Sequence, residues 1–275
     1  MKQINYINCS NYIRLVGAKV ISEKYLRVSE EDKDDPLDGE KEKEEEKIPK
    51  LVLLLTKGGE EFENFMIKSK DELISIVIQV AATMAMGEEM LELEHRDAHV
   101  SNILIEKTNE EDLEYYIGGK KIIVKSNKIL IKMIDFGKSR IRNGTELVYC
   151  DDWDIESNEP NETEEHGDLH YKIYPRMNEI IGGNWKNYFP ETNVLWIRYL
   201  IQILSRFDGS GLASEDPGTQ AFQKAEESNK KQLAPEDGKE VAEKFFDAIK
   251  NCKTAGEFVF QLYEDSYFHY ILKKV

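Results

Sequence analysis

The chain has 275 residues, 40% of them hydrophobic, so it is long enough and apolar enough for one large domain or two small lobes. Its formal net charge of -16 opposes direct binding to DNA phosphates and favours basic partners. It has no run of 18 apolar residues and no start typical of a signal peptide, and its three scattered cysteines suit reduced thiols, so we expect a nuclear or cytoplasmic protein without a membrane span.

The first third of the chain predicts two strands, an acidic insertion and a long helix. Residues 11–28 alternate and are rich in Val, Ile and Tyr, which is typical of a strand, and residues 49–56, PKLVLLLT, suit a short buried strand. Between them, residues 29–47 hold eleven Asp or Glu against four Lys, and we interpret them as a disordered, solvated insertion. Residues 69–94 place apolar side chains at helical spacing after a Ser69–Glu72 capping box, which predicts a long buried helix.

The rest of the chain predicts short strands followed by helices. A strand is expected at 103–105, a hairpin across Gly118 and Gly119, and another strand that runs into a turn near residue 135. Helices are expected over 193–204, 236–252 and 254–272, with a polar stretch from about 206 to 235 between the first two.

One stretch, residues 91–107 with the sequence LELEHRDAHVSNILIEK, indicates chemistry. His95, Arg96 and Asp97 stand in a row, and Asn102 follows five residues after the aspartate. The pattern H-R-D-x-x-x-x-N followed by D-F-G supplies what phosphoryl transfer needs: a carboxylate to orient the attacking hydroxyl and accept its proton, and a second carboxylate and an amide oxygen to hold Mg²⁺. We therefore predict Asp97 as the base, Asn102 as a metal ligand, and Asp135, in MIDFGKSR, as the main metal ligand. The alternative, a charged turn and an unrelated strand end, would have to produce all three by chance.

Two other motifs look like parts of a phosphotransferase, and we interpret neither as catalytic. The sequence HGDLHYKI, from His166, is similar to the catalytic loop of small-molecule phosphotransferases, but Ile173 stands where the asparagine is needed. The tripeptide APE at 234–236 is similar to the end of an activation segment, but it lies about a hundred residues after Asp135. We expect Pro235 and the acidic residues after it to form the first turn of a helix.

In these details the sequence resembles the haspin-type atypical protein kinases. Their catalytic loop reads EHRD.H..N, and His99 stands here where most Ser/Thr kinases carry lysine. They also insert a hairpin before the metal-binding aspartate, and residues 113–128 match it. Further matches follow this aspartate: Arg140, Val148, Cys150 and Asp151; Gly167, Asp168, Ile173 and Tyr174; and the W..Y.P..NVLW..YL block from Trp185 to Leu200.

The resemblance implies an α+β, protein kinase-like fold, with a reduced β-rich N-lobe over 1–57 and a mostly helical C-lobe over 58–275. It implies transfer of the γ-phosphoryl group of ATP, with Mg²⁺, to Thr or Ser of a basic, histone tail-like protein. It also implies an activation segment that works without phosphorylation, so that Arg96 needs no phosphate partner. The residues expected to contact the nucleotide are Thr56, Lys57, Gly58, Leu104 and Ile134. Those expected to meet the substrate are Glu61, Glu63, His99, Asp154 and Glu156.

The sequence also departs from the family pattern. Haspins usually carry a different pair in place of Phe136 and Gly137, and Lys172 stands where an acidic residue is expected. No G-x-G-x-x-G precedes the catalytic loop, and the roughly thirty residues after Lys19 leave no room for the helix whose Glu holds a nucleotide lysine. The sequence thus resembles a kinase with a shortened first lobe. Three hypotheses stay open: a haspin-type kinase, a catalytically impaired pseudokinase or scaffold, and a small-molecule phosphotransferase of related fold, which the haspin-specific blocks disfavour.

Overall fold

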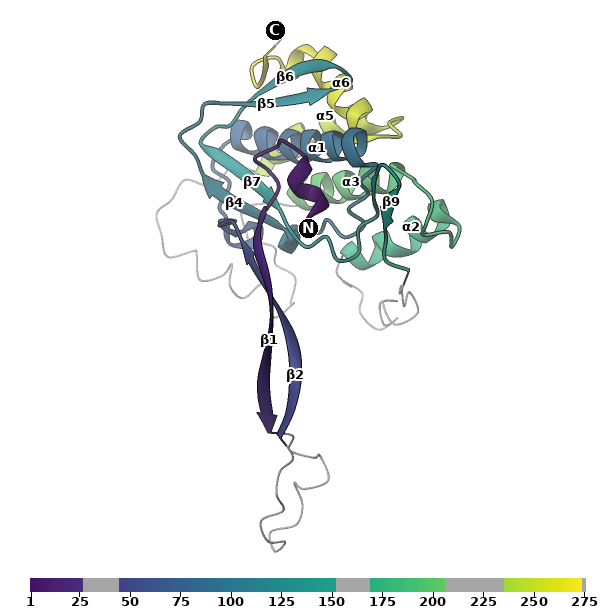
Figure 1. Ribbon diagram of the computed structural model, residues 1–275. Helices are drawn as coiled ribbons and strands as arrows, with labels where there is room; N and C mark the ends of the chain where they lie inside the picture. Colours follow the sequence, from purple (N-terminus) through teal and green to yellow (C-terminus); the bar gives the residue numbers. More distant parts are fainter. Residues whose placement is uncertain (27–44, 152–168, 206–234, 274–275) are drawn as a thin grey trace, which may run out of the picture. The chain divides into compact units, whose positions relative to one another are not determined.

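The structure is a computed structural model that describes residues 1–26, 45–151, 169–205 and 235–273 (Figure 1). The chain divides into two compact units, a large unit of Met1–Ile13 with Gly58–Val275 and a hairpin unit of Arg14–Lys57. One boundary falls between residues 57 and 58, as in the division expected from the sequence, and the first thirteen residues belong to the large unit. The assignment of residues 1–57 to a reduced N-lobe stays a prediction.

The hairpin unit consists of β1 (Leu15–Leu26) and β2 (Glu45–Leu55), which pair antiparallel. Residues 45–47 of the expected acidic insertion are already part of β2, and residues 27–44 lie outside the described part of the chain. The prediction that 49–56 form a buried strand is wrong, because β2 pairs with β1 in a two-stranded ladder and its apolar side chains are exposed. The large apolar side chains that stay exposed in it are Val16, Val20, Leu51, Val52, Leu53, Leu54 and Leu55.

The core of the large unit is built around α1 (Lys70–Leu91) (Figure 1). This helix packs against two strands, β5 (Asp112–Ile117) and β7 (Ile129–Met133), and against three helices, α3 (Glu191–Ser205), α5 (Pro235–Ile249) and α6 (Ala255–Glu264). The hydroxyl of Ser69 accepts the backbone N–H of Glu72 at 3.2 Å, as predicted, while the Glu72 carboxylate accepts the N–H of Lys68 at 2.7 Å. By length and hydropathy α1 could also cross a membrane, but 89% of its apolar stretch is buried inside the fold, as expected of a core helix. Its C-cap, Glu92, adopts a left-handed conformation (φ 43°) and turns the chain toward His95.

Two three-stranded antiparallel sheets belong to the large unit. One has the order β3-β4-β7, and the other has the order β10-β6-β5. Because β4 and β7 are antiparallel, the start of β4 and the end of β7 lie at the same end of their sheet, with Ile103 opposite Met133. The strand bounds are β3 Glu60–Glu61, β4 Ile103–Lys107, β5 Asp112–Ile117, β6 Lys120–Lys125, β7 Ile129–Met133 and β10 Leu272–Lys273. A small hairpin adds β8 Ile141–Asn143 and β9 Glu146–Val148.

The hairpin between β5 and β6 forms as predicted, with Gly118 and Gly119 at positive φ values of 56° and 71°. The helices of the C-terminal half are α2 Ile173–Ile181, α3 Glu191–Ser205, α5 Pro235–Ile249 and α6 Ala255–Glu264. The start of α5 at Pro235 confirms the interpretation of that residue as a first-turn proline. The single helix predicted over 254–272 is wrong beyond Glu264: the Asp265 carboxylate accepts the N–H of Tyr267 at 2.9 Å in a new 3₁₀ turn, and β10 then pairs with β6.

Candidate active site

The catalytic loop predicted from the sequence begins at a β-bridge and ends in a short 3₁₀ helix. Glu94 and Arg140 form an isolated antiparallel bridge, each accepting the other's backbone N–H at 2.9 Å. The loop ends in the 3₁₀ helix η4 (Val100–Asn102), which leads directly into β4. Within it, Arg96 has a φ of 63°, and Asp135 after β7 has a φ of 53°. Left-handed backbone at two non-glycine residues stores strain, a feature that clusters at functional sites.

Hydrogen bonds join this loop to the segment that carries Asp135. The backbone N–H of Ile134 donates to the carbonyl of Asn102 at 3.1 Å, and the His95 ring nitrogen Nε2 donates to the carbonyl of Ile134 at 2.9 Å. The rings of His95 and Phe136 have centroids 4.8 Å apart. Burial lowers the pKa of His95 to about 4, although Asp97 and Asp135 both act to raise it. His95 is therefore neutral, and its Nε2–H group holds the two loops together.

Asp97 is a buried carboxylate with partners on both oxygens. The hydroxyl of Tyr174, on α2, donates to its Oδ1 at 2.5 Å, and the ammonium of Lys138 lies 3.7 Å from its Oδ2. Burial first, and then Asp97, raises the pKa of Tyr174, so this hydroxyl keeps its proton and serves as a donor. Asp97 is 7% exposed. The arrangement fixes the orientation of the residue predicted to be the base.

Asn102 and Asp135 suit the metal-binding roles predicted for them. The Asn102 amide nitrogen Nδ2 donates to the backbone carbonyl of Asp97 at 2.8 Å and to His99 Nε2 at 3.0 Å, so both its hydrogens are used and its carbonyl oxygen is left to face a cation. Asp135 is exposed, and its Oδ1 accepts the N–H of Gly137 at 3.1 Å. In the described part of the chain no three His, Cys, Asp or Glu side chains gather as a metal site. Two oxygen ligands suit Mg²⁺, which commonly completes its shell with phosphates and water.

Arg96 is held inside the protein. Its guanidinium makes two hydrogen bonds to the Glu94 carboxylate, at 3.1 and 3.0 Å, and others to the backbone carbonyls of Trp185 at 2.8 Å and Asn187 at 3.2 Å. Glu94 also accepts the Thr192 hydroxyl at 2.9 Å. Both charged side chains are fully buried. These contacts anchor the loop to the segment before α3, and the expectation that Arg96 needs no phosphate partner stays a prediction.

Of the residues predicted to contact the nucleotide, Gly58, Leu104 and Ile134 belong to the large unit, and Thr56 and Lys57 belong to the hairpin unit. Gly58 packs so closely on Leu104 that a Cβ at Gly58 would overlap the Leu104 side chain, and Ile134 adjoins the site through its bonds to Asn102 and His95. Thr56 closes the hairpin unit, because its hydroxyl accepts the N–H of Arg14 at 3.0 Å. Lys57 ends the same unit. Nucleotide binding by these five residues stays a prediction.

Three of the residues predicted to meet the substrate, Glu61, Glu63 and His99, lie on or next to elements that contact one another, because β3 and the 3₁₀ helix Phe62–Asn64 both contact η4. Glu61 is exposed on β3, where it pairs with Leu104 of β4 and accepts the side-chain amide of Asn64 at 3.3 Å. Glu63 lies in the 3₁₀ helix of Phe62–Asn64. His99 is part of the catalytic loop, with Nε2 4.0 Å from Oδ1 of Asp97. Asp154 and Glu156 lie outside the described residues.

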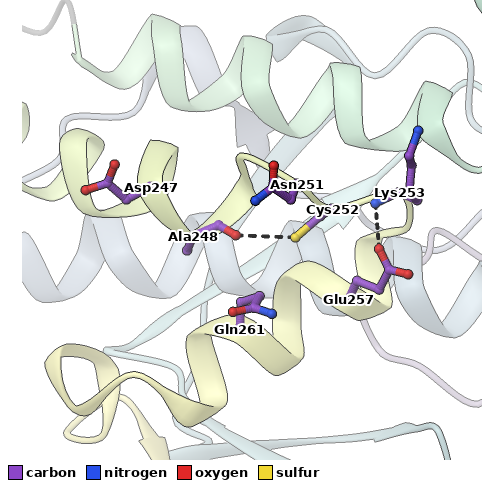
Figure 2. A pocket seen from close by; sticks show the side chains of 7 residues that line it. All are labelled: Asp247, Ala248, Asn251, Cys252, Lys253, Glu257 and Gln261. Atoms are coloured by element: carbon purple, nitrogen blue, oxygen red, sulfur yellow. Dashed lines mark hydrogen bonds between the residues drawn. The ribbon is translucent and has the colours of Figure 1, made fainter.

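A pocket of about 380 Å³ lies where α5 and α6 meet (Figure 2). It has a mainly polar lining that includes Cys252, Lys253 and Glu257. The Cys252 thiol donates to the carbonyl of Ala248 at 3.3 Å, and the backbone N–H of Lys253 donates to Glu257 at 2.6 Å. None of the residues predicted for catalysis or binding lines it, so we assign it no part in phosphoryl transfer.

Sequence reasoning missed the residues that hold the site together. Tyr174 and Glu94 were noticed only as parts of family motifs, and Lys138 was not singled out. Their partners lie far away in sequence, since 77 positions separate Tyr174 from Asp97. A proton-holding tyrosine and a buried carboxylate carry no spacing signal that would reveal such contacts.

A loop with the H-R-D-x-x-x-x-N motif is hydrogen-bonded to the segment of Asp135 at one end of a small antiparallel sheet, beside a buried central helix. This arrangement is that of a protein kinase-like fold of the α+β class. The family can be stated more closely. Residues 16–254 match the family described as Haspin like kinase domain, and the chain belongs to this family of serine/threonine kinases.

Curated relatives agree with the family. The chain is 33% identical over 154 residues to a serine/threonine-protein kinase haspin homolog of Arabidopsis thaliana, a match that covers 56% of this chain and 25% of the relative. It is 34% identical over 152 residues to the serine/threonine-protein kinase haspin of Mus musculus, covering 54% of this chain and 20% of the relative. A haspin homolog of Drosophila melanogaster is 29% identical over 150 residues, covering 54% and 26%. The chain therefore spans about a quarter of the length of these relatives.

Proposed function

We propose that this chain transfers the γ-phosphoryl group of ATP to Thr or Ser of a basic, histone tail-like protein. The observation that carries the proposal is Asp97, a buried carboxylate held by Tyr174 and Lys138 within a loop that is hydrogen-bonded to the segment of Asp135. The relatives named above are serine/threonine-protein kinases, and this supports the reaction type.

Each residue of the site has a part that follows from its contacts. Oδ1 of Asp97 already accepts the Tyr174 hydroxyl, so the substrate hydroxyl would meet Oδ2 and give up its proton there as its oxygen bonds to phosphorus. The Asn102 carbonyl and the Asp135 carboxylate would hold Mg²⁺. When bound, Mg²⁺ and ATP supply the phosphoryl group and neutralise its developing charge. Fixed positions for the base and the metal ligands are what this reaction requires of a protein.

The negative net charge of the chain supports a basic substrate. The net charge of -16 favours encounter with a basic peptide, and Glu61 presents an exposed carboxylate on the strand next to β4. We propose that Glu61 and Glu63 belong to the peptide-binding surface, together with Asp154 and Glu156, and that the protein works in the nucleus or cytoplasm. His99 is proposed to meet the substrate next to the base, since its ring adjoins Asp97.

A catalytically impaired pseudokinase or scaffold is the second candidate. Lys19, which superficially matches a nucleotide lysine, lies exposed on β1 opposite Val52. This sequence has no G-x-G-x-x-G before the catalytic loop. A kinase without a glycine-rich loop and a nucleotide-binding lysine would lose on the order of a thousandfold in rate.

One experiment separates the candidates. The melting temperature of the chain is measured with and without Mg-ATP, for the wild type and for Asp135→Asn, and transfer of labelled phosphate to a histone-three tail peptide is followed in parallel. The kinase proposal predicts a Mg²⁺-dependent rise in melting temperature that Asp135→Asn loses, and transfer to the basic peptide but not to an acidic peptide of equal length. Binding of Mg-ATP without transfer would support the impaired pseudokinase. Absence of both binding and transfer would overturn the kinase proposal and favour a scaffold.

A further inference from the structure

Lys138 occupies a position at the catalytic base that no motif assigns to it. It follows Gly137 in the segment that begins with Asp135, and its ammonium lies 3.7 Å from Oδ2 of Asp97. The same ammonium lies over the ring of Tyr174, 4.9 Å from its centroid. Its side chain is 39% exposed, so the charge sits at the open side of a carboxylate that is otherwise buried. Lys138 thus contacts both the base and the residue that holds the base.

His99 does not supply this charge in the geometry observed. It stands where most Ser/Thr kinases carry lysine, but its Nε2 accepts a hydrogen bond from the Asn102 amide at 3.0 Å. A ring nitrogen that accepts a hydrogen bond carries no proton, so it presents a lone pair and not a cation. Among the described residues, Lys138 is the lysine whose ammonium lies within 4 Å of the Asp97 carboxylate.

We propose that Lys138 is a positioning residue for phosphoryl transfer, whose ammonium holds Oδ2 of Asp97 while Tyr174 holds Oδ1. The inference rests on the proposed kinase function. A carboxylate with one oxygen hydrogen-bonded to a hydroxyl and the other paired with a cation 3.7 Å away is restrained from rotating away from the incoming hydroxyl. The ammonium also offsets the repulsion between the Asp97 carboxylate and a negatively charged phosphoryl group that approaches it.

The expected effect is on turnover and not on peptide affinity. Removing the ammonium leaves the Asp97 carboxylate less well oriented, and this lowers the rate of the step in which the hydroxyl attacks. The peptide contacts proposed for this chain lie on other residues, so KM for the peptide is expected to change little. Lys138 is partly exposed, so water screens its charge, and we expect a moderate fall in kcat.

The test compares three variants of the whole chain. Lys138→Met removes the charge and keeps the aliphatic length, and Lys138→Arg restores a cation. Lys120→Met is the matched control, because Lys120 also lies over an aromatic ring, 5.2 Å from the centroid of Phe260, in the β5–β6 hairpin. We expect Lys138→Met to lower kcat about tenfold or more with KM within about twofold, Lys138→Arg to recover most of the loss, and Lys120→Met to match the wild type. A kcat for Lys138→Met equal to that of Lys120→Met would overturn the proposal.

A second measurement needs no turnover and so separates this inference from the proposed function. Urea unfolding of the wild type, Lys138→Met, Asp97→Asn and the double variant forms a double-mutant cycle. The proposal predicts non-additive shifts of the unfolding midpoint, because each single change breaks the same contact. Additive shifts would overturn the proposal even if the chain is an active kinase. If the wild type transfers no phosphate, the proposed function fails for this chain, and the cycle still decides whether Lys138 holds Asp97.

Discussion

Glu94 and Arg96 form a two-point ion pair from which water is excluded, with both side chains fully buried. The carboxylate also accepts the backbone N–H of Phe189 and the hydroxyl of Thr192, each at 2.9 Å. A buried pair of this kind contributes little net stability by itself, but it is costly to break on one side only. The arginine of the H-R-D motif thus serves to anchor the catalytic loop.

Glu94→Gln is therefore expected to destabilise the protein strongly. The change keeps the shape of the side chain but leaves the Arg96 charge buried without its counter-ion, which costs on the order of 3 kcal/mol of unfolding free energy. Glu114→Gln is the control, since Glu114 pairs with Lys121 at the surface and its loss costs about 0.5 kcal/mol or less. Urea unfolding measures both. Equal losses in the two variants would show that the buried pair does not anchor the loop.

Tyr174→Phe tests the hydrogen bond to Asp97, the proposed base. The variant keeps the aromatic ring beneath Lys138 and removes only the hydroxyl that donates to Asp97 at 2.5 Å. We expect kcat to fall about tenfold, because a carboxylate that has lost its hydrogen bond at Oδ1 is less well oriented as a general base. Tyr116→Phe, at an exposed position on β5, is expected to leave kcat unchanged. A Tyr174→Phe enzyme as active as this control would rule out an orienting role for the hydroxyl.

Gly59 is expected to tolerate no side chain. Its φ is 114°, and an added Cβ would overlap the backbone carbonyl of Ile105 on β4. Gly119 is the matched control, because its φ of 71° is also positive but no atom lies within 4 Å of an added Cβ. Gly119→Ala should therefore lower the free energy of unfolding by about 1 kcal/mol through backbone strain alone. Gly59→Ala should lower it clearly more, because the overlap with Ile105 adds to the strain. Thermal unfolding of both variants measures the difference. Equal melting temperatures would indicate that β3 does not pack on β4 as described.

The helix α1 and the catalytic loop could be predicted from the sequence because their signals are local. The Ser69 cap, the apolar spacing after it and the H-R-D-x-x-x-x-N motif each lie within a few residues of the structure they specify. The turn at Gly118 and Gly119 is local in the same way. The hydrogen bond between the segments of Asn102 and Asp135 fits the expectation that the two residues lie near each other, while their roles as metal ligands stay predictions.

Other features depend on partners that are distant in the chain. The strand β10 forms because Leu272 meets Val124 of β6, and no pattern within residues 254–272 signals that pairing. The expectation that residues 49–56 are buried assumed packing against another layer, whereas the side chains from Leu51 to Leu55 are exposed. The contacts of Lys138 and Tyr174 with Asp97 join three separate segments in the same way.

Glu88 gives the protein a distinctive pH dependence. Burial raises the pKa of this carboxyl from 4.5 to about 7, although hydrogen bonds from Asn193 and from the backbone of Ala255 and Gly256 oppose the shift. Between pH 4.5 and 7 the unfolded chain has lost this proton while the folded chain keeps it, so the contribution of Glu88 to stability falls as pH rises. His95 acts in the opposite direction: its pKa of about 4 means that its contribution is complete above pH 6.5 and is lost as pH falls toward 4.

Glu88→Gln should separate the two effects. Without the carboxyl only the effect of His95 remains, so the free energy of unfolding of the variant is expected to increase as the pH is raised from 4.5 to 6.5. The difference in unfolding free energy between variant and wild type is expected to grow in favour of the variant by up to about 3 kcal/mol from pH 5 to pH 8. Urea unfolding at several pH values measures this difference. A difference between variant and wild type that does not change with pH would contradict the raised pKa of Glu88.

The central claim is that Asp97 is the base of a phosphoryl transfer carried out by this chain. Its most direct test is single-turnover transfer of labelled phosphate from Mg-ATP to a histone-three tail peptide, with the wild type and Asp97→Asn compared at matched Mg-ATP occupancy. The predicted result is transfer by the wild type and a loss of about a hundredfold or more in Asp97→Asn, with Mg-ATP binding retained. Equal transfer by the two proteins would contradict the assignment of Asp97 as the base.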